Sequence, residues 1–178
     1  IIPAILIGRH FGLSDHKIKQ ALKTFQPLTH RLEFVTEING VKYYDDSIAT
    51  NPRAAIAALK TFAHQAKVKN IILLAGGHER QQDFSQLAQV IKNSPIKAIS
   101  LFPPTGQRLL AELEKVDISN QLRNKTEEFS TMKEAVYHAQ QNAKPGDVVL
   151  LSPGAASFGL FENYKHRGQE FKKEVLAK

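Results

Sequence analysis

Three polar stretches of the chain combine residue types that bind ligands. The first, DDSIATN at 45–51, places two carboxylates, two hydroxyl side chains and an amide just before a proline. The others are GGHER at 76–80 and SPGAAS at 152–157, which add a cation, further hydroxyl groups and glycines. Carboxylates and amides accept hydrogen bonds, whereas arginine and hydroxyl groups donate them. Because each stretch follows an apolar run, the sequence predicts a binding site built from loops.

The elements that must position these loops alternate between strand and helix patterns. LEFVTEI (32–38) and VKYYDDS (41–47) flank Asn39-Gly40, which favours a two-residue type I′ hairpin because both turn positions need positive φ. NIILLAGG (70–77) is a continuous apolar run, typical of a central parallel strand covered on both faces. The sequence therefore predicts a sheet that opens with an antiparallel pair and continues with parallel strands.

Helical patterns separate the later strands. Pro52 suits the first turn of a helix. After it, four residues fall on one inward face at helical spacing: Ala55, Ile56, Leu59 and Phe62. Further helices are expected at DFSQLAQVIKN, TGQRLLAELEKV, TMKEAVYHAQQNA and FENYKHRGQEFKKEVLAK, strands at AISLFP and DVVLLSP, and a weak segment near 121–129. We expect an α/β fold with a Rossmann-like, mostly parallel sheet and helices on both faces. The three polar stretches then lie at its carboxyl edge, where ligands bind in such folds.

The first 28 residues carry a different pattern. Residues 1–12 look like the end of a helix, and SDHKIKQALKTF (14–25) predicts a second helix with Ser14 as its N-cap. Pro27 ends this run, so we expect a domain boundary near residue 28. The chain begins without an initiator Met, and we expect it to be part of a longer protein.

The composition argues against several functional classes. With 178 residues and 42% apolar content the chain is typical of a globular domain, and without cysteine it has neither disulfides nor thiolate metal ligands. No apolar run is long enough to span a bilayer, so we expect no membrane insertion. The net charge of +7 suits a polyanion, but the lysines are scattered and no RNA-binding signature occurs, so we expect no nucleic-acid partner. His30 and His78 lack the spacing of metal ligands.

Four motifs, taken together, resemble a known family. They are His30-Arg31, DDSIATN (45–51), LLAGGHERQQDF (73–84) and PGDVVLLSPGAASFGLFENYKHRGQEF (145–171). Their order and spacing are similar to the C-terminal domain of the Mur ligases, in particular the branch that joins D-glutamate to UDP-N-acetylmuramoyl-L-alanine. AILIGRHFGLSDHKIKQAL also resembles the last helices of that family's central ATP-binding domain. The resemblance divides the chain into residues 1–28, the tail of the central domain with a linker, and residues 29–178, the C-terminal domain.

The resemblance implies ATP-dependent amide-bond formation in cytoplasmic peptidoglycan synthesis. In this family a substrate carboxylate attacks the γ-phosphate of ATP, and the amino group of the incoming amino acid then displaces phosphate from the resulting acyl phosphate. ATP and Mg²⁺ are thus implied as cofactors, with UDP-N-acetylmuramoyl-L-alanine and glutamate as substrates. The phosphate-binding loop and the metal ligands belong to the family's central domain, so we expect no metal site in this chain. We expect a cytoplasmic monomer, inactive as an isolated piece.

The resemblance assigns two residues to ATP. Arg31 would contact the phosphates and Asp46 the ribose hydroxyls, because a guanidinium suits phosphate and a carboxylate accepts from a diol. The alternatives are that Arg31 is a solvated charge and that Asp46 accepts hydrogen bonds within a turn or at a helix cap.

Five residues would hold the incoming amino acid: Thr50, Arg80, Ser157, Phe158 through its backbone, and Tyr164. The carboxylates of this substrate need a cation together with hydroxyl and N–H donors. Structural alternatives exist for three of them. Thr50 could cap the helix that begins near Pro52, Ser157 could cap the last helix, and Tyr164 could belong to the core.

The chain departs from the family pattern at two lysine positions. Ile48 stands where the D-glutamate branch has the lysine of DSKATN, and Arg80 stands where it has a lysine after the double glycine. Arginine binds carboxylates in a planar, bidentate manner that lysine does not share, so these changes concern amino-acid specificity. We expect D-glutamate to be the amino acid that is added, with an L-glutamate-adding variant as the alternative. A folylpolyglutamate synthase, another Mur ligase and a non-catalytic α/β binding module are further alternatives.

Overall fold

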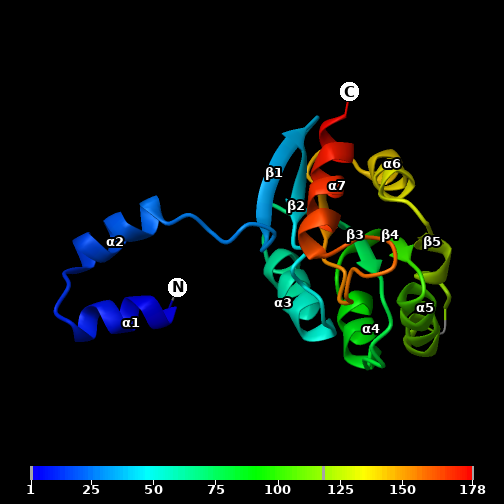
Figure 1. Cartoon of the computed structure of the whole chain (residues 1–178), viewed down its shortest axis with the longest axis horizontal. Helices are drawn as coiled ribbons and strands as arrows, with labels where there is room; N and C mark the ends of the chain where they lie inside the picture. The colour runs from blue at the N-terminus through cyan, green and yellow to red at the C-terminus, as the bar shows by residue number, and fades with distance from the viewer. Residues whose placement is uncertain (1, 118, 178) are drawn as a thin grey trace.

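The computed structural model describes residues 2–117 and 119–177, so Ile1 and Lys178, the outer residues of the two predicted terminal helices, lie outside it. Its main body is a six-stranded sheet of order β1-β2-β6-β3-β4-β5 between two layers of helices (Figure 1). The strands are β1 (Glu33–Ile38), β2 (Val41–Asp45), β3 (Ile71–Gly76), β4 (Ile96–Phe102), β5 (Thr126–Glu128) and β6 (Val148–Leu151). β1 runs antiparallel to β2, and the remaining neighbours pair in parallel. The predicted α/β fold with an antiparallel N-terminal hairpin is confirmed.

Helices cover both faces of this sheet, as the alternating pattern predicts. One face packs against α3 (Pro52–Ala63), α4 (Ser85–Lys92) and α5 (Thr105–Val116). The other face packs against α6 (Met132–Asn142) and α7 (Tyr164–Leu176). The weak segment near 121–129 forms a short 3-10 turn, η1 (Arg123–Lys125), that leads directly into β5.

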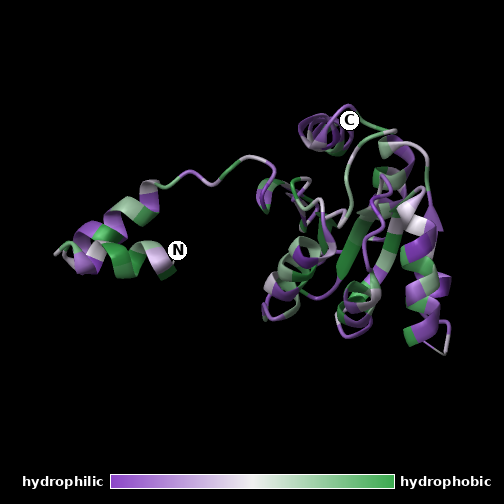
Figure 2. Cartoon of the chain, turned by 60° about the horizontal axis from the view of Figure 1, so that its bottom comes forward, coloured by the Kyte–Doolittle hydropathy of each residue, from purple (hydrophilic) through white to green (hydrophobic). Residues whose placement is uncertain are grey.

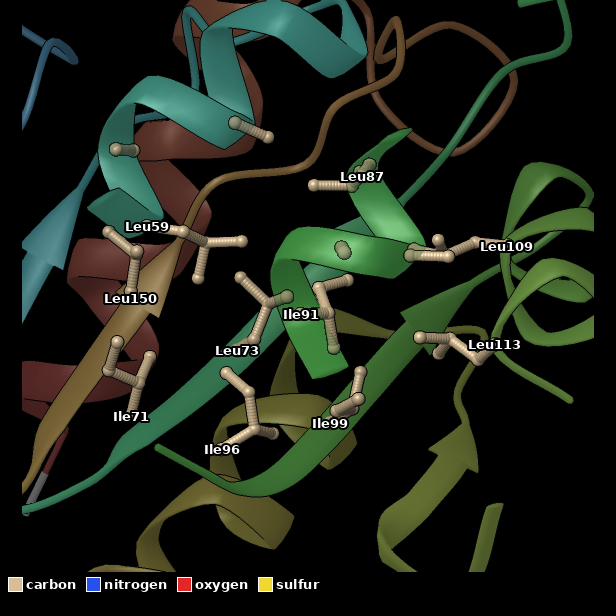
Figure 3. Packing of buried hydrophobic residues seen from close by; sticks show 14 of the residues in the cluster. Leu59, Ile71, Leu73, Leu87, Ile91, Ile96, Ile99, Leu109, Leu113 and Leu150 are labelled. Carbon is tan, nitrogen blue, oxygen red and sulfur yellow. The ribbon is translucent and has the colours of Figure 1, made fainter. Parts of the chain in front are cut away.

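β3 lies at the centre of the hydrophobic core. Ile71 and Leu73 join the cluster beneath α3, α4 and α5, whereas Ile72 and Leu74 join the cluster beneath α6 and α7, since successive side chains of a strand point to opposite faces. Figure 3 shows the first of these clusters, with Ile91 of α4 pointing toward the strands. Burying a side chain of this size contributes roughly 1.5–3 kcal/mol. The densely packed strands therefore fix the position of the loops that follow them.

Turn and cap residues set the boundaries of the first elements. Asn39 and Gly40 have φ angles of 51° and 76°, as the tight turn between β1 and β2 requires. Pro52 occupies the first turn of α3. The Asn51 side chain caps this helix by accepting a hydrogen bond from the Ala54 amide at 3.0 Å. The helix therefore starts immediately behind the first polar stretch.

Two further helices, α1 (Ile2–His10) and α2 (Asp15–Thr24), lie apart from the sheet and connect to it through an extended segment (Figure 1). Ser14 caps α2, as predicted, by accepting a hydrogen bond from the Lys17 amide. Figure 2 shows hydrophobic strands inside the main body and hydrophobic residues on α1 and α2 away from that core. Large apolar side chains are exposed in this part of the chain: Ile2, Leu6, Ile7, Phe11, Leu13, Phe25 and Leu28. Within the described residues no helix is long and apolar enough to cross a membrane. The domain boundary near residue 28 stays a prediction.

Candidate functional site at the carboxyl edge of the sheet

β2, β6 and β3 are neighbours in the sheet and end at the same edge. Leu151 pairs with Asp45 on one side and with Leu74 on the other. Beyond the strands, the Asp46 amide donates to the Leu151 carbonyl at 2.8 Å. The Ser152 amide likewise donates to the Leu74 carbonyl at 3.1 Å. The three polar stretches therefore emerge side by side, as predicted. Apart from Asp45 and Gly76, which end β2 and β3, they belong to the β2-α3 loop (46–51), the β3-α4 loop (77–84) and the β6-α7 loop (152–163).

The β3-α4 and β6-α7 loops meet at a glycine. Gly77 has a φ of 141°, and a Cβ there would overlap the carbonyl oxygen of Ala156. The following amide, of His78, donates to the same carbonyl at 2.8 Å. Glycine is needed at this position because any side chain would push the two loops apart.

A buried arginine fastens the β2-α3 loop to the β6-α7 loop. Arg167 of α7 is 0% exposed, and it donates to the hydroxyl and carbonyl oxygens of Ser47 at 3.0 and 2.9 Å. Its Nη1 donates to the carbonyl oxygens of Ala155 and Ala156 at 3.1 and 3.2 Å. Burial lowers the pKa of Arg167 to about 9, so the group stays protonated at neutral pH. A planar guanidinium reaches all of these oxygens at once, whereas an ammonium does not.

Asp46 fastens the segment that carries Arg31. Its Oδ1 accepts a hydrogen bond from the Leu32 amide at 3.1 Å, and its Oδ2 accepts one from the Ser152 hydroxyl at 2.7 Å. Burial raises the pKa of this carboxyl to about 6, although the two hydrogen bonds and the charge of Arg31 act in the opposite direction. Each oxygen of a carboxylate accepts more than one hydrogen bond, so Asp46 keeps capacity for a ligand hydroxyl. The Arg31 side chain is exposed.

A second network supports the same segment. His30 Nδ1 donates to Asp45 Oδ2 at 2.7 Å, and the His30 amide donates to Glu33 at 2.7 Å. Lys172 of α7 donates to both oxygens of Glu33 at 2.7 Å and lies 3.7 Å from Asp45. Burial by itself raises the pKa of Glu33, but the hydrogen bonds from His30 and Lys172 outweigh it and lower the pKa. Gly168 lets α7 approach, because a Cβ there would overlap His30 Nδ1.

His30, Glu33 and Asp45 bring ligand-type atoms within 4.8 Å of one another. This grouping does not suit a divalent cation, because the Lys172 ammonium already lies against both carboxylates. The Nδ1 atom of His30 is also already engaged in its hydrogen bond with Asp45. The cluster instead holds the backbone immediately before Arg31.

The two hydroxyls that the sequence assigns to the amino-acid site do not cap helices. Asn51 rather than Thr50 caps α3, and Asn163 rather than Ser157 caps α7. The capping alternatives are therefore wrong for both residues. The carbonyl of Thr50 accepts a hydrogen bond from Gln82 Nε2 at 3.1 Å, which joins the β2-α3 loop to the β3-α4 loop.

Aromatic contacts complete the edge of the site. The guanidinium carbon of Arg80 lies 5.4 Å from the centroid of the Phe158 ring, and His78 meets the same ring edge-on at 6.0 Å. Tyr164, at the start of α7, meets the His30 ring edge-on at 6.0 Å. The Tyr164 side chain is half-buried, so it lies at the margin of the core rather than inside it.

A family model described as Mur ligase, glutamate ligase domain, matches residues 30–154, well over half of the chain. The chain belongs to the Mur ligase family. It is 42% identical over 174 residues to UDP-N-acetylmuramoylalanine--D-glutamate ligase of Caldicellulosiruptor bescii, covering 98% of this chain and 36% of that relative. It is 43% identical over 166 residues to the ligase of the same name from Roseiflexus sp. strain RS-1, covering 93% and 34% of the two chains. The chain spans about a third of the length of these curated relatives.

Solved structures share the Mur ligase fold with this chain. The MurF ligase of Thermotoga maritima, solved in complex with ADP, superimposes with a TM-score of 0.60 at 16% identity, over 96% of this chain and 36% of that one. At this level of identity the likeness concerns the fold. The expected fold of a Mur ligase C-terminal domain is thus confirmed by topology as well as by sequence.

The structure of this Mur ligase domain brings most of the predicted site residues together. Five of them lie on the three adjacent loops: Asp46, Thr50, Arg80, Ser157 and Phe158. Arg31 joins them because Asp46 holds the next residue's amide, and Tyr164 joins them through its contact with His30.

The supporting residues were missed by site reasoning from the sequence. Ser47 and Arg167 connect two loops, Asp45 holds the histidine before Arg31, and Gly168 leaves room for that histidine. One signal was available: a glycine inside a helical pattern, as at Gly168, indicates the close approach of another segment. The contact of Arg167 with Ser47 could not be read from the sequence, because the two residues are 120 positions apart.

Proposed function

We propose that this chain is the C-terminal part of an ATP-dependent ligase that joins glutamate to UDP-N-acetylmuramoyl-L-alanine, with D-glutamate as the preferred substrate. One observation carries the proposal: the polar residues of the motifs lie on three adjacent loops of a Mur ligase domain, and its curated relatives are named for that reaction. Donors for anionic groups and a carboxylate that accepts from hydroxyls occur together there, as ATP and an amino acid would require.

ATP is proposed to contact Arg31 and Asp46. Within the described residues no hydrogen bond or ion pair engages the Arg31 guanidinium, so its donors are available for phosphate oxygens. The spare lone pairs of Asp46 would accept from ribose hydroxyls. Mg²⁺, held by residues outside this chain, would neutralise the phosphates when bound. In the acyl phosphate mechanism, Arg31 would hold the phosphate oxygens of ATP in place while the phosphoryl group is transferred.

The incoming glutamate is proposed to contact the other five residues: Thr50, Arg80, Ser157, the Phe158 backbone and Tyr164. The guanidinium of Arg80 would bind a carboxylate in a bidentate manner, and the hydroxyls of Thr50 and Ser157 would donate to the second carboxylate. Exclusion of the capping roles leaves both hydroxyls available for this purpose. The amino group of glutamate would then be held for attack on the acyl phosphate.

The chain is proposed to form one wall of a site that another domain completes. Residues 1–28 would be the tail of that central ATP-binding domain and a linker, and residues 29–178 the domain that closes over it. The apolar side chains exposed on α1 and in the turn that follows it, such as Phe11 at 77%, support this arrangement because a larger domain would bury them. We expect the isolated chain to be inactive, and the full-length enzyme to be a cytoplasmic monomer.

Phosphate release by the full-length protein tests the proposal. With ATP, Mg²⁺ and UDP-N-acetylmuramoyl-L-alanine present, we expect release on addition of D-glutamate and none without an amino acid. Release by the 178-residue chain alone would contradict the proposed division of the site.

An L-glutamate-adding ligase is the second candidate function. Ile48 and Arg80, which replace the lysines of the D-glutamate branch, favour it. Release with L-glutamate alone would establish this variant. Release with neither enantiomer would favour the non-catalytic binding module.

A further inference from the structure

Two arginines near the β3-α4 loop lie over phenylalanine rings, but their hydrogen bonding differs. Arg108 of α5 lies 5.7 Å from the Phe84 ring and donates to Glu79 at 2.6 Å and to a loop carbonyl at 2.9 Å. Arg80 lies 5.4 Å from the Phe158 ring. In the part of the chain that the structure describes, no hydrogen bond or ion pair engages the Arg80 guanidinium. The N–H donors of Arg80 are therefore free to bind a ligand, whereas Arg108 already donates hydrogen bonds within the protein.

Core packing does not account for the position of the Phe158 side chain. It is 46% exposed, and its aromatic and cationic contacts are with Arg80 and His78. The backbone holds the two loops that carry these residues together. The His78 amide donates to the Ala156 carbonyl at 2.8 Å, and Gly77 permits the close approach of the loops. The stack therefore connects two loops whose separation is already fixed.

A guanidinium that lies over an aromatic face keeps its N–H groups available at its rim. Arginine binds carboxylates through two parallel N–H donors in one plane, so its orientation decides whether both bonds form. A ring that limits the rotation of this plane lowers the entropic cost of binding. A lysine ammonium has no such plane, and a neighbouring ring would orient it far less.

We propose that Phe158 is a positioning residue for Arg80, whose ring holds the guanidinium with its free edge toward a carboxylate of the incoming amino acid. This assigns a role to the Phe158 side chain, beyond the backbone contact, and it rests on the proposed glutamate ligation. The aromatic ring and the arginine act as one unit that sets affinity for a carboxylate-bearing substrate.

The test uses the full-length protein that carries this chain, with phosphate release measured against the glutamate enantiomer that the wild type accepts. Phe158→Leu is expected to raise KM for glutamate about two- to fivefold, the range for an exposed cation–π contact, and to leave KM for ATP unchanged. Phe158→Tyr keeps the ring and is expected to retain the wild-type KM. In an Arg80→Ala background, Phe158→Leu is expected to have no further effect on KM for glutamate.

The matched control is Tyr137→Leu, which removes a ring that is 62% exposed on α6. An unchanged KM in Phe158→Leu, or an equal rise with and without Arg80, overturns the inference and leaves the proposed function standing. A wild type that releases no phosphate with either glutamate enantiomer overturns the proposed function, and the inference with it. Thermal unfolding of every variant separates these effects from loss of folded protein.

Discussion

Arg167 and Ser47 are joined across 120 positions of the chain, with the arginine donating to the serine carbonyl at 2.9 Å and to its hydroxyl at 3.0 Å. The Ser47 hydroxyl in turn donates to the Tyr164 carbonyl at 2.8 Å. The start of the last helix therefore determines the shape of the β2-α3 loop, which carries Asp46 and Thr50. Substitutions in α7 are expected to alter that loop.

Arg167→Lys is expected to reduce the free energy of unfolding by about 3–5 kcal/mol, because an ammonium leaves buried carbonyls without donors. Denaturant titration followed by circular dichroism measures this loss. Arg53→Lys, an exposed change of the same kind, is expected to stay within about 0.5 kcal/mol of the wild type. Equal effects of the two substitutions would show that the buried hydrogen bonds are unimportant.

Asp46 is expected to make stability fall as pH rises. Its pKa is about 6 in the folded chain against 3.8 for the unperturbed group, with burial as the main cause. Between about pH 4 and 6 the folded state holds a proton that the unfolded state has lost, so the free energy of unfolding decreases through this window and stays lower above it. The expected decrease is roughly 2–3 kcal/mol.

Asp46→Asn isolates this contribution from the other carboxyl groups. The amide does not titrate, so the variant is expected to gain stability relative to the wild type as pH rises through the same window. The carboxyls whose pKa values are lowered, such as those of Asp117 and Asp147, act in the opposite direction but are common to both proteins. A stability difference that is independent of pH would contradict the raised pKa of Asp46.

Gly168→Ala is expected to destabilise the chain although alanine favours helices. The added Cβ would overlap His30 Nδ1 and come within 2.6 Å of Asp45 Oδ2. Overpacking of this kind costs about 1–3 kcal/mol against a gain in helix propensity of about 1 kcal/mol, so we expect a net loss of up to about 2 kcal/mol. Denaturant titration measures the net change. Gly8→Ala, where the nearest atoms belong to the flexible Ile18 side chain at 3.2 Å, serves as the helical control and is expected to be near neutral.

Thr50→Ala is expected to raise KM for glutamate about tenfold or more, because a hydrogen bond to a charged group contributes roughly 1.5–3 kcal/mol. KM for ATP should stay unchanged, since Thr50 is not proposed to contact the nucleotide. Phosphate release by the full-length protein measures both constants. Thr61→Ala is the control, because the Thr61 hydroxyl donates to the Ala57 carbonyl within α3. A parallel rise in both constants would assign Thr50 to the shape of the loop instead.

The elements of the fold could be predicted because their signals are local. Asn39-Gly40 specifies a turn through its own φ angles, and the run before Gly76 specifies a buried strand through its own hydropathy. The meeting of the three loops followed from a general rule about parallel strands rather than from any contact. These predictions needed no knowledge of distant neighbours.

The supporting contacts could not be predicted because their partners are remote in the chain. Nothing near Arg167 in sequence indicates Ser47, and nothing near Asp46 indicates Ser152, 106 positions away. The capping alternative for Thr50 is wrong for a different reason. Thr50 and Asn51 are both good N-cap residues, and the backbone conformation that distinguishes them is set by the sheet edge.

The hydrogen bond from the Leu32 amide to Asp46 links the neighbourhood of Arg31 to the sheet. His30 and Leu32 are both tied to the end of β2, by hydrogen bonds of 2.7 and 3.1 Å to Asp45 and Asp46. The extended segment at 25–28 precedes this anchor and connects it to α2. Because the residues on both sides of Arg31 are bonded to the end of β2, Arg31 keeps its place relative to the sheet at whatever angle α2 lies to it.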